Sequence, residues 1–285
     1  MGRQKPNNRN RKSKRRDKRN NQNVDANDLL FEERYDLTAD NIETTMADGC
    51  PKDMNTVVKG IIGKKPYVKP KTENQGKLMT LIQDNIITFA HGPAGTGKSF
   101  IATFSALKLL WNANNKIDKI VIIKPACEVV GEKIGYLPGS AEDKISVYAY
   151  STLNIIEKIV GATATEQLVS EGFIKPSPLG FIRGCTFDNA VVILEEGQNT
   201  SKEQMKTFLS RIGENSKYIV TGDVNQSDRF HKNPNTSGLA DALTRLKGID
   251  GIETDFEFDQ DDIVRNPIIK KILFKYEMLG DEIVE

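Results

Sequence analysis

The chain has 285 residues, of which 38% are hydrophobic, enough for one sizeable α/β domain with extensions. No apolar run approaches the roughly 18 residues that cross a membrane, and the basic stretch after Met1 lacks the apolar block of a secretory signal. We therefore expect a soluble, cytoplasmic protein without membrane contact. Cys50, Cys127 and Cys185 are odd in number and far apart, which indicates reduced thiols rather than a disulfide framework or a zinc site.

The formal net charge of +1 conceals a strongly basic beginning. Residues 1–20 hold ten Lys or Arg and one Asp, a net charge of +9, which leaves −8 on the rest of the chain. No apolar residue follows Met1 in this stretch, so residues 1–23 are predicted to be a disordered basic tail. We expect the tail to contact phosphates of RNA or single-stranded nucleic acid in a salt-dependent way. It could instead be a solubilising or targeting tail, or fold back onto the chain's own acidic surface.

Residues 24–70 are predicted to connect this tail to the main domain. Residues 24–48 are acidic, with Arg34 as their one basic residue, and suit a short helix or connector. Residues 51–73 are rich in Pro, Gly and Lys, which indicates a linker or a small extended hairpin. The main domain is predicted over residues 71–280, and no internal repeat is present.

The eight residues GPAGTGKS at 92–99 match the phosphate-binding pattern G-x-x-x-x-G-K-[ST]. The β-branched run at 84–90 predicts a strand before the loop, and the apolar spacing over 98–111 predicts a helix after it. In this pattern backbone N–H groups surround the phosphates, Lys98 reaches the β- and γ-phosphates, and the Ser99 hydroxyl goes to Mg²⁺. The predicted loop residues are Gly92, Pro93, Ala94, Gly95, Thr96, Gly97, Lys98 and Ser99. The alternative is a glycine-rich turn before an ordinary helix.

Three later segments predict further strands of the same sheet. Residues 117–125, 189–199 and 217–226 are apolar runs that end in polar residues or proline. Such continuous runs are typical of parallel strands that are buried on both faces. Because ligands bind outside the carboxyl ends of parallel strands, we expect these polar residues to converge on the phosphates.

Two adjacent carboxylates stand at the end of the second of these runs. We expect Glu195 to hold a metal-bound water of Mg²⁺ and Glu196 to orient or deprotonate the attacking water. Neighbouring strand residues point to opposite faces, so the pair can share these tasks only if the strand ends there. The alternative is a solvated acidic turn.

Three glutamines are candidate contacts with the nucleotide. Gln198 and Gln226 follow predicted strands, where a neutral amide can sense the γ-phosphate or the attacking water; either could be a simple turn residue. Gln75, upstream of the first strand, can offer both a donor and an acceptor to an adenine edge.

Residues 124–150 follow a strand at the ligand edge and are rich in Gly, Lys and Tyr. This composition suits a loop that contacts nucleic acid through Lys124, Lys133 and Tyr136. An equally good interpretation makes Tyr136 and Leu137 a buried plug or a subunit contact.

Taken together, these motifs resemble the PhoH-like ATPase family over about residues 71–280. The resemblance rests on ENQ, GPAGTGKS, KPACEVVGEKIGYLPG, FIRGCTFDNAVVILEEGQNTSKEQMKTFLSRIG, SKYIVTGDVNQSD, SGLADAL and DIVRNPIIKKILFKYE. It implies an α/β fold: a RecA-like P-loop NTPase with a mostly parallel sheet and helices on both faces. It also implies binding and hydrolysis of ATP with Mg²⁺, and a role with RNA or single-stranded nucleic acid.

The resemblance also assigns particular positions. Gln75 matches the adenine-reading glutamine of helicases, and Gly222, Asp223 and Gln226 match their GD-x-x-Q motif. Glu195 and Glu196 fall on a pair that is usually Asp then Glu, and the extra methylene of Glu195 implies altered Mg²⁺ binding or slow hydrolysis.

A helicase completes its site with arginines from a second RecA-like domain, and this chain has one such domain. The family resemblance implies that neighbouring subunits of a homo-oligomer, such as a hexameric ring, supply the arginine in trans. Arg265, at the start of a helix predicted over 262–279, is the first candidate, followed by Arg211 and Arg183. Each could equally be an ordinary surface arginine.

Three functions therefore stay open. The first is an ATPase coupled to nucleic acid, and the second is a small-molecule kinase, although the paired acids and glutamines favour water as the acceptor. The third is a nucleotide-gated RNA-binding or scaffolding protein with little hydrolysis.

Overall fold

The computed structural model describes residues 54–125, 141–226, 236–264 and 268, with the backbone alone for 141–148. Several positions named above lie outside the described residues, namely the basic tail, the acidic connector, Cys50, Cys127, Lys133, Tyr136, Leu137 and Arg265.

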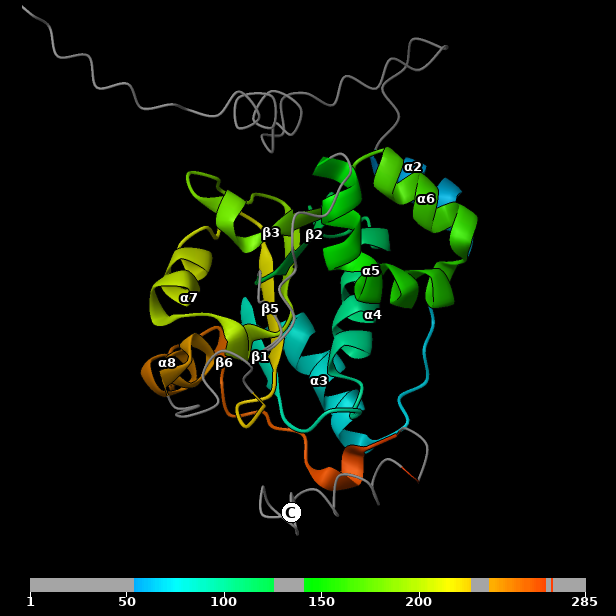
Figure 1. Ribbon diagram of the computed structural model, residues 1–285. Helices are drawn as coiled ribbons and strands as arrows, with labels where there is room; N and C mark the ends of the chain where they lie inside the picture. Colours follow the sequence, from blue (N-terminus) through cyan, green and yellow to red (C-terminus); the bar gives the residue numbers. More distant parts are fainter. Residues whose placement is uncertain (1–53, 126–140, 227–235, 265–267, 269–285) are drawn as a thin grey trace, which may run out of the picture. The chain divides into compact units, whose positions relative to one another are not determined.

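The described chain is built on a six-stranded sheet in which every pairing is parallel. The strand order is β3-β2-β4-β5-β1-β6 (Figure 1). The strands are β1 (Ile87–His91), β2 (Lys119–Lys124), β3 (Ile174–Pro178), β4 (Ala190–Leu194), β5 (Lys217–Gly222) and β6 (Ile252–Glu253). This sheet confirms the predicted α/β class.

The two strands that the sequence did not predict are the two edges of the sheet. β3 contains Pro176 and Pro178, which cannot donate to a neighbouring strand, so its sequence reads as a loop. β6 has only two residues, Ile252 and Glu253, too few to form a pattern. The four apolar runs that were predicted correspond to β1, β2, β4 and β5.

Helices cover both faces of the sheet, as predicted (Figure 1). One face is covered by α2 (Met54–Ile62), α3 (Glu73–Asp84), α4 (Lys98–Trp111), α5 (Ala141–Val160) and α6 (Ala162–Ser170). The other face carries α7 (Lys202–Leu209) and α8 (Gly238–Arg245). Short 3₁₀ turns are η2 (Leu179–Ile182), η3 (Gly197–Asn199) and η5 (Gln260–Asp262).

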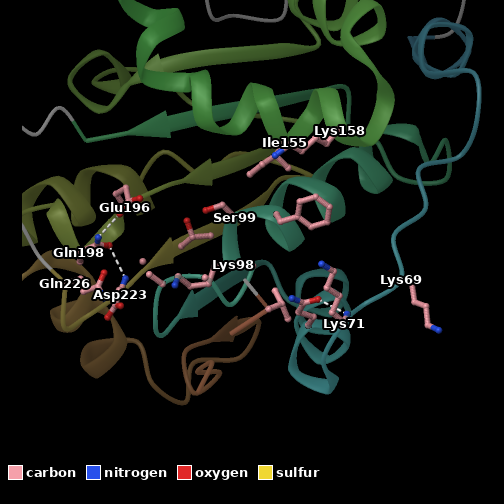
Figure 2. Close-up of a pocket in the computed structure, with 18 residues that line it drawn as sticks. Lys69, Lys71, Lys98, Ser99, Ile155, Lys158, Glu196, Gln198, Asp223 and Gln226 are labelled. Atoms are coloured by element: carbon pink, nitrogen blue, oxygen red, sulfur yellow. Dashed lines mark hydrogen bonds between the residues drawn. The ribbon is translucent and has the colours of Figure 1, made fainter. Parts of the chain in front are cut away.

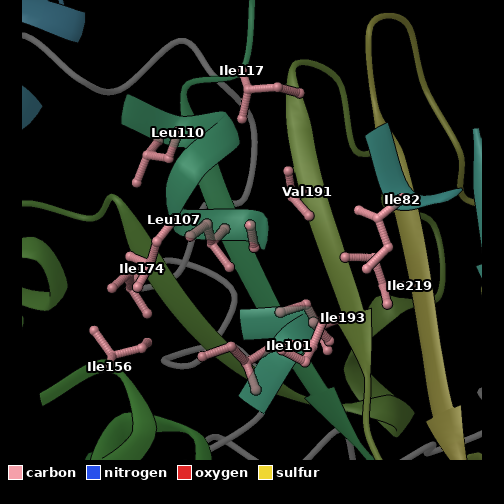
Figure 3. Close-up of a cluster of buried hydrophobic side chains, with 14 of the residues drawn as sticks. Ile82, Ile101, Leu107, Leu110, Ile117, Ile156, Ile174, Val191, Ile193 and Ile219 are labelled. Atoms are coloured by element: carbon pink, nitrogen blue, oxygen red, sulfur yellow. The ribbon is translucent and has the colours of Figure 1, made fainter. Parts of the chain in front are cut away.

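Alternation along the strands divides the core between these two layers. Ile122 and Ile193 belong to the cluster beneath α4, which Figure 3 shows between the helix and the sheet. Tyr218 of β5 is fully buried and packs its ring 4.9 Å from that of Phe208 on α7. Burial on both faces explains why the strands read as continuous apolar runs rather than alternating ones.

The extended linker predicted over 51–73 is wrong for residues 54–62, which form α2. Its apolar residues recur at helical spacing, and Val58, 1% exposed, lies in the same core cluster as α4. The Gly and Lys residues around the helix obscured that spacing. The helix ends at Gly63, whose φ of +72° suits glycine, and residues 63–72 form neither helix nor strand.

The helix predicted over 262–279 falls mostly outside the described residues. Within them, η5 ends at Asp262 and residues 263–264 are not helical. No helix in the described part of the chain has the length and apolarity needed to cross a membrane.

Candidate nucleotide-binding site

A cavity of about 550 Å³ lies at the carboxyl edge of the sheet, beside the ends of β1 and β5 and the segment that follows β4 (Figure 2). Its walls come from the 92–99 loop, the start of α4, Gln75 and the lysines before it, and the segments that follow β4 and β5. The polar ends of the strands thus meet at one place, as the parallel topology predicts.

The 92–99 loop depends on glycines in the left-handed region. Gly92, Gly95 and Gly97 have φ of +129°, +88° and +91°. A Cβ on Gly92 would lie 2.4 Å from the carbonyl oxygen of Phe258, whose N–H donates to the carbonyl oxygen of His91 at 2.9 Å. The loop is therefore closed from behind by the chain near Phe258, and its other side faces the cavity.

Lys98 begins α4 and its side chain lies over the loop. Its Nζ donates to the carbonyl oxygens of Gly92 at 2.6 Å and Pro93 at 2.7 Å. Ser99 lines the cavity beside it, at the helix terminus where unpaired N–H groups favour an anion. The loop, the lysine and the helix end together fit a chain of phosphates.

Gln75 is buried, and its amide joins two segments of the site. The Oε1 atom accepts from the Lys71 N–H at 2.8 Å, and Nε2 donates to the carbonyl oxygen of Thr96 at 2.9 Å. A Cβ on Gly97 would lie 2.8 Å from this Nε2, so the glycine also makes room for the amide. Gln75 lines the cavity, and the remaining hydrogen and lone pair of its amide leave capacity for the predicted adenine contact.

The side chains of Glu195 and Glu196 lie apart because β4 ends at Leu194, just before them. A strand that ends there is the condition under which the two carboxylates were expected to share the site. Glu195 is 3% exposed; its N–H donates to the Ile123 carbonyl oxygen at 2.9 Å, and its Oε2 accepts from Ser151 Oγ at 3.3 Å. Glu196 has a left-handed φ of +53° and is exposed. Among the described residues, the cavity lining includes Glu196 and not Glu195.

Gln198 links the ends of two neighbouring strands. Its Nε2 donates to Glu196 Oε2 at 2.7 Å, and its Oε1 accepts from the Asp223 N–H at 3.1 Å (Figure 2). A Cβ on Gly222 would lie 2.7 Å from this Oε1, so the close approach requires glycine. Gln226 is exposed and also lines the cavity.

Asp223 is a buried carboxylate in the site. From the sequence it was recognised only as part of the GD-x-x-Q motif, with no role of its own. Burial raises its pKa, while nearby Lys98 and His91 oppose that rise. Its Oδ1 accepts from the Asn225 N–H at 3.0 Å.

Seven cavity residues had no place in the predicted site: Lys69, Lys71, Phe100, Ile155, Lys158, Thr221 and Val264. Lys69 and Lys71 could have been predicted, because they belong to the lysine-rich stretch just before Gln75. Ile155 and Lys158 are distant in sequence, and only the fold brings α5 to the cavity.

The structure separates the arginine candidates that it describes from this cavity. Arg211 precedes β5 and so lies at the amino edge of the sheet, where it donates to the Cys185 carbonyl oxygen at 3.4 Å and to Ser210 Oγ at 3.1 Å. Arg183 is exposed just after η2. Neither lines the cavity, so a role in catalysis for either would have to be in another subunit's site. Lys124 is half-buried at the end of β2, and Cys185 is a free thiol.

Within the described ranges, no three His, Cys, Asp or Glu side chains are grouped to hold a metal. A nucleotide-dependent Mg²⁺ needs no such group, because it keeps several waters and binds mainly to phosphates with one or two protein oxygens. The Ser99 hydroxyl on the cavity wall, with carboxylates after β4 and β5, fits that requirement.

Comparisons with known proteins agree with this geometry. The model of the PhoH-like protein family matches residues 67–277. A PhoH-like protein of Bacillus subtilis is 42% identical over 78% of this chain, and one of Synechocystis is 38% identical over 74%. Protein PhoH of Escherichia coli is 33% identical over 72% of the chain. The aligned regions span 67%, 62% and 57% of these relatives' own lengths.

Among solved structures, Bacteroides Pif1 bound to ssDNA aligns with 15% identity and a TM-score of 0.25, over 56% of this chain and 33% of that one. That similarity is too low to carry an argument. The family match covers most of the described residues, the glycine loop and the parallel sheet included. The chain therefore belongs to the PhoH-like protein family, and its fold and phosphate-binding loop are those of a P-loop NTPase.

Proposed function

We propose that this protein binds ATP with Mg²⁺, hydrolyses it, and couples hydrolysis to RNA or single-stranded nucleic acid. The observation that carries the proposal is the Glu196–Gln198–Asp223 hydrogen-bonded chain on the same cavity as Lys98 and Ser99. It supplies a carboxylate for a water molecule opposite a loop for phosphates, which is the arrangement that hydrolysis needs.

The phosphate-binding half of the site neutralises charge. Lys98 exchanges its contacts with the carbonyl oxygens of Gly92 and Pro93 for the β- and γ-phosphates. When Mg²⁺ is bound, the Ser99 hydroxyl would be one of its ligands and Glu195 would hold a water of that ion. Mg²⁺, when bound, offsets the negative charge of the phosphates. Gln75 contacts the adenine edge.

The other half of the site handles the attacking water. Glu196 accepts a proton from that water while the water oxygen forms a bond to the γ-phosphorus. The bond between the γ-phosphorus and the β,γ-bridging oxygen breaks, which leaves ADP and phosphate. Gln198 holds the Glu196 carboxylate by its Nε2–H, and thereby ties the base to the end of β5. Gln226 on the same wall senses whether the γ-phosphate is present.

The test is phosphate release by the wild type, Lys98→Ala and Glu196→Gln, with and without RNA. We expect Lys98→Ala to lose nucleotide binding and release, and Glu196→Gln to keep binding while release falls about 10²- to 10⁴-fold, the usual worth of a general base. Lys108→Ala, an exposed change far along α4, serves as the control.

Full activity in Lys98→Ala would refute the proposal. An absence of stimulation by any polymer would remove the nucleic-acid part alone. ADP formed without matching phosphate would indicate a kinase.

A nucleotide-gated RNA-binding or scaffolding protein with little hydrolysis is the second candidate. The buried Glu195, bound by Ser151 Oγ, favours it because the longer side chain displaces the carboxylate relative to the usual Asp. If Glu195 is what slows hydrolysis, Glu195→Asp should speed phosphate release; equal rates would show that the glutamate is no impediment.

A further inference from the structure

Residues 63–72 form a strap between α2 and α3 that is strongly basic. Its sequence, GKKPYVKPKT, holds four lysines and no acidic residue. Pro66 and Pro70 fix their own backbone angles and push the residues before them into extended conformations. The strap is therefore held extended before any partner binds.

The strap presents its side chains to solvent. Pro66 is buried, whereas Tyr67 is 82% exposed, the most exposed of the large hydrophobic side chains in the described structure. Lys64 and Lys69 are also exposed, and no described carboxylate forms an ion pair with either. An exposed aromatic ring among lysines suits a polyanion with flat bases, because the ring can stack on a base while the lysines neutralise phosphates.

The two ends of the strap lie near the two ends of α4. At one end the Lys65 ammonium lies 5.9 Å from the centre of the Trp111 ring, at the last residue of that helix. At the other end the Lys71 N–H bonds to Gln75, which bonds to Thr96 in the phosphate loop. Figure 1 shows this thread between α2 and α3. Residues 64–71 in extended form span about 26 Å.

We infer that the strap is a binding surface for single-stranded nucleic acid, with a base stacked on Tyr67 and backbone phosphates on Lys64, Lys65 and Lys69. This inference deepens the proposed function and rests on it for the choice of partner. It adds a contact surface distinct from residues 1–20 and from the segment after β2. It also places the polymer next to the nucleotide, because Lys69 and Lys71 line the cavity.

The first measurement is binding of a fluorescent 12-nucleotide oligo(U) to the full chain, without ATP, at several salt concentrations. Tyr67→Ala should weaken binding at least fivefold, the loss of about one stacked base, and Tyr67→Phe should keep it. Lys64→Ala with Lys65→Ala should lower the salt slope by about 0.7 for each phosphate that is no longer neutralised. Phe181→Ala is the control, since Phe181 in η2 is also an exposed aromatic side chain, at 48%, and lies outside residues 124–150.

The second measurement is direct. An oligo(U) that carries 5-iodouridine should cross-link to Tyr67 on irradiation, with the cross-linked peptide identified by mass spectrometry. Cross-links confined to residues 1–20, together with unchanged affinity in Tyr67→Ala, would overturn the inference.

These results are separable from the fate of the proposed function. Binding of a fluorescent ATP analogue to Tyr67→Ala should be normal, because Tyr67 does not line the cavity. Polymer bound at the strap without any stimulation of phosphate release would defeat the coupling and leave the strap standing. If phosphate release by Tyr67→Ala is still stimulated and its affinity for oligo(U) is unchanged, the coupling stands and the strap is not the binding surface.

Discussion

Gly92 has no room for a side chain on the face that meets Phe258. Its φ of +129° is one that L-residues rarely adopt, and an added Cβ would also lie 2.9 Å from the Phe258 backbone nitrogen. One of the two carbonyl oxygens that Lys98 contacts belongs to this same residue. At this position a side chain would therefore meet both an unfavourable φ and the Phe258 backbone, next to the carbonyl oxygen that Lys98 contacts.

We expect Gly92→Ala to lower the free energy of unfolding by about 3 kcal/mol, and Tm by roughly 6 to 12 °C, through strain and overpacking. Calorimetry and binding of a fluorescent ATP analogue would check this. Gly60→Ala is the control: it lies within α2, nothing comes within 4 Å of its added Cβ, and it should gain about 0.5 to 1 kcal/mol. A stable Gly92→Ala with intact binding would contradict the role given to Phe258.

His91, at the end of β1, connects the stability of the site to pH. Burial, which disfavours the imidazolium, lowers its pKa below the ordinary 6.5, although Glu257, Asp223 and the Thr254 backbone act in the opposite direction. Lys98 adds to the lowering.

Since the folded chain keeps His91 neutral while the unfolded chain takes up a proton near pH 6.5, stability should fall as pH drops below that value. Urea unfolding at intervals from pH 8 to pH 5.5 would measure this, and His91→Gln should show a shallower decline. The same slope in both proteins would exclude His91 as the cause.

At the scale of elements, α2 belongs to the core although the family match begins only at residue 67. Val58 is buried in the cluster that α2 shares with α4 and α6, so the helix covers apolar surface that would otherwise meet water. The folded domain thus begins earlier than the predicted residue 71.

Val58→Ala should lower the free energy of unfolding by about 2 kcal/mol, from lost apolar burial and the cavity left behind. Thr56→Ala, exposed on the same helix, should change it by less than about 0.5 kcal/mol. Equal stability of both variants in thermal unfolding would show that α2 is a dispensable extension.

The elements that the sequence predicted share a physical property, and so do those that it missed. β1, β2, β4, β5 and α4 are recognisable because each carries an unbroken apolar run or stripe, the result of burial on both sides. β3 and β6 at the sheet edges lack that signal, and in α2 the apolar stripe is short and stands among Gly and Lys residues. In the site, contiguous motifs such as 92–99 were readable, whereas Ser151, Ile155 and Lys158 on α5 come to it through tertiary contacts alone.

At the scale of the whole molecule, the described cavity has lysines but no arginine on its walls. Arg265 lies outside the described residues, so the prediction that a neighbouring subunit of a homo-oligomer completes the site, with Arg265 as first candidate, stays a prediction. Such a site needs residues from two copies, and that requirement can be tested without knowing the number of subunits.

We expect Lys98→Ala and Arg265→Ala each to be inactive alone, and an equimolar mixture to recover about a quarter of the wild-type rate of phosphate release. The fraction follows from random pairing around a closed ring, where each active site needs one subunit of each kind in the right order. A mixture of Lys98→Ala and Glu196→Gln should recover nothing, because both changes disable the same half of the site. If no activity returns in the first mixture either, the arginine acts within its own chain.

The sheet order has a consequence for the time at which this protein becomes functional. β1, which leads into the phosphate loop, lies between β5 and β6, and its partner β5 follows it by about 130 residues. At a synthesis rate of about 5 to 20 residues per second, β1 waits roughly 7 to 26 seconds on the ribosome before that partner emerges. Phe258, which closes the loop from behind, emerges later still. If the protein binds ATP as proposed, a nascent chain acquires that affinity only after Phe258 has been translated, so ATP would stabilise the folded domain and not its fragments.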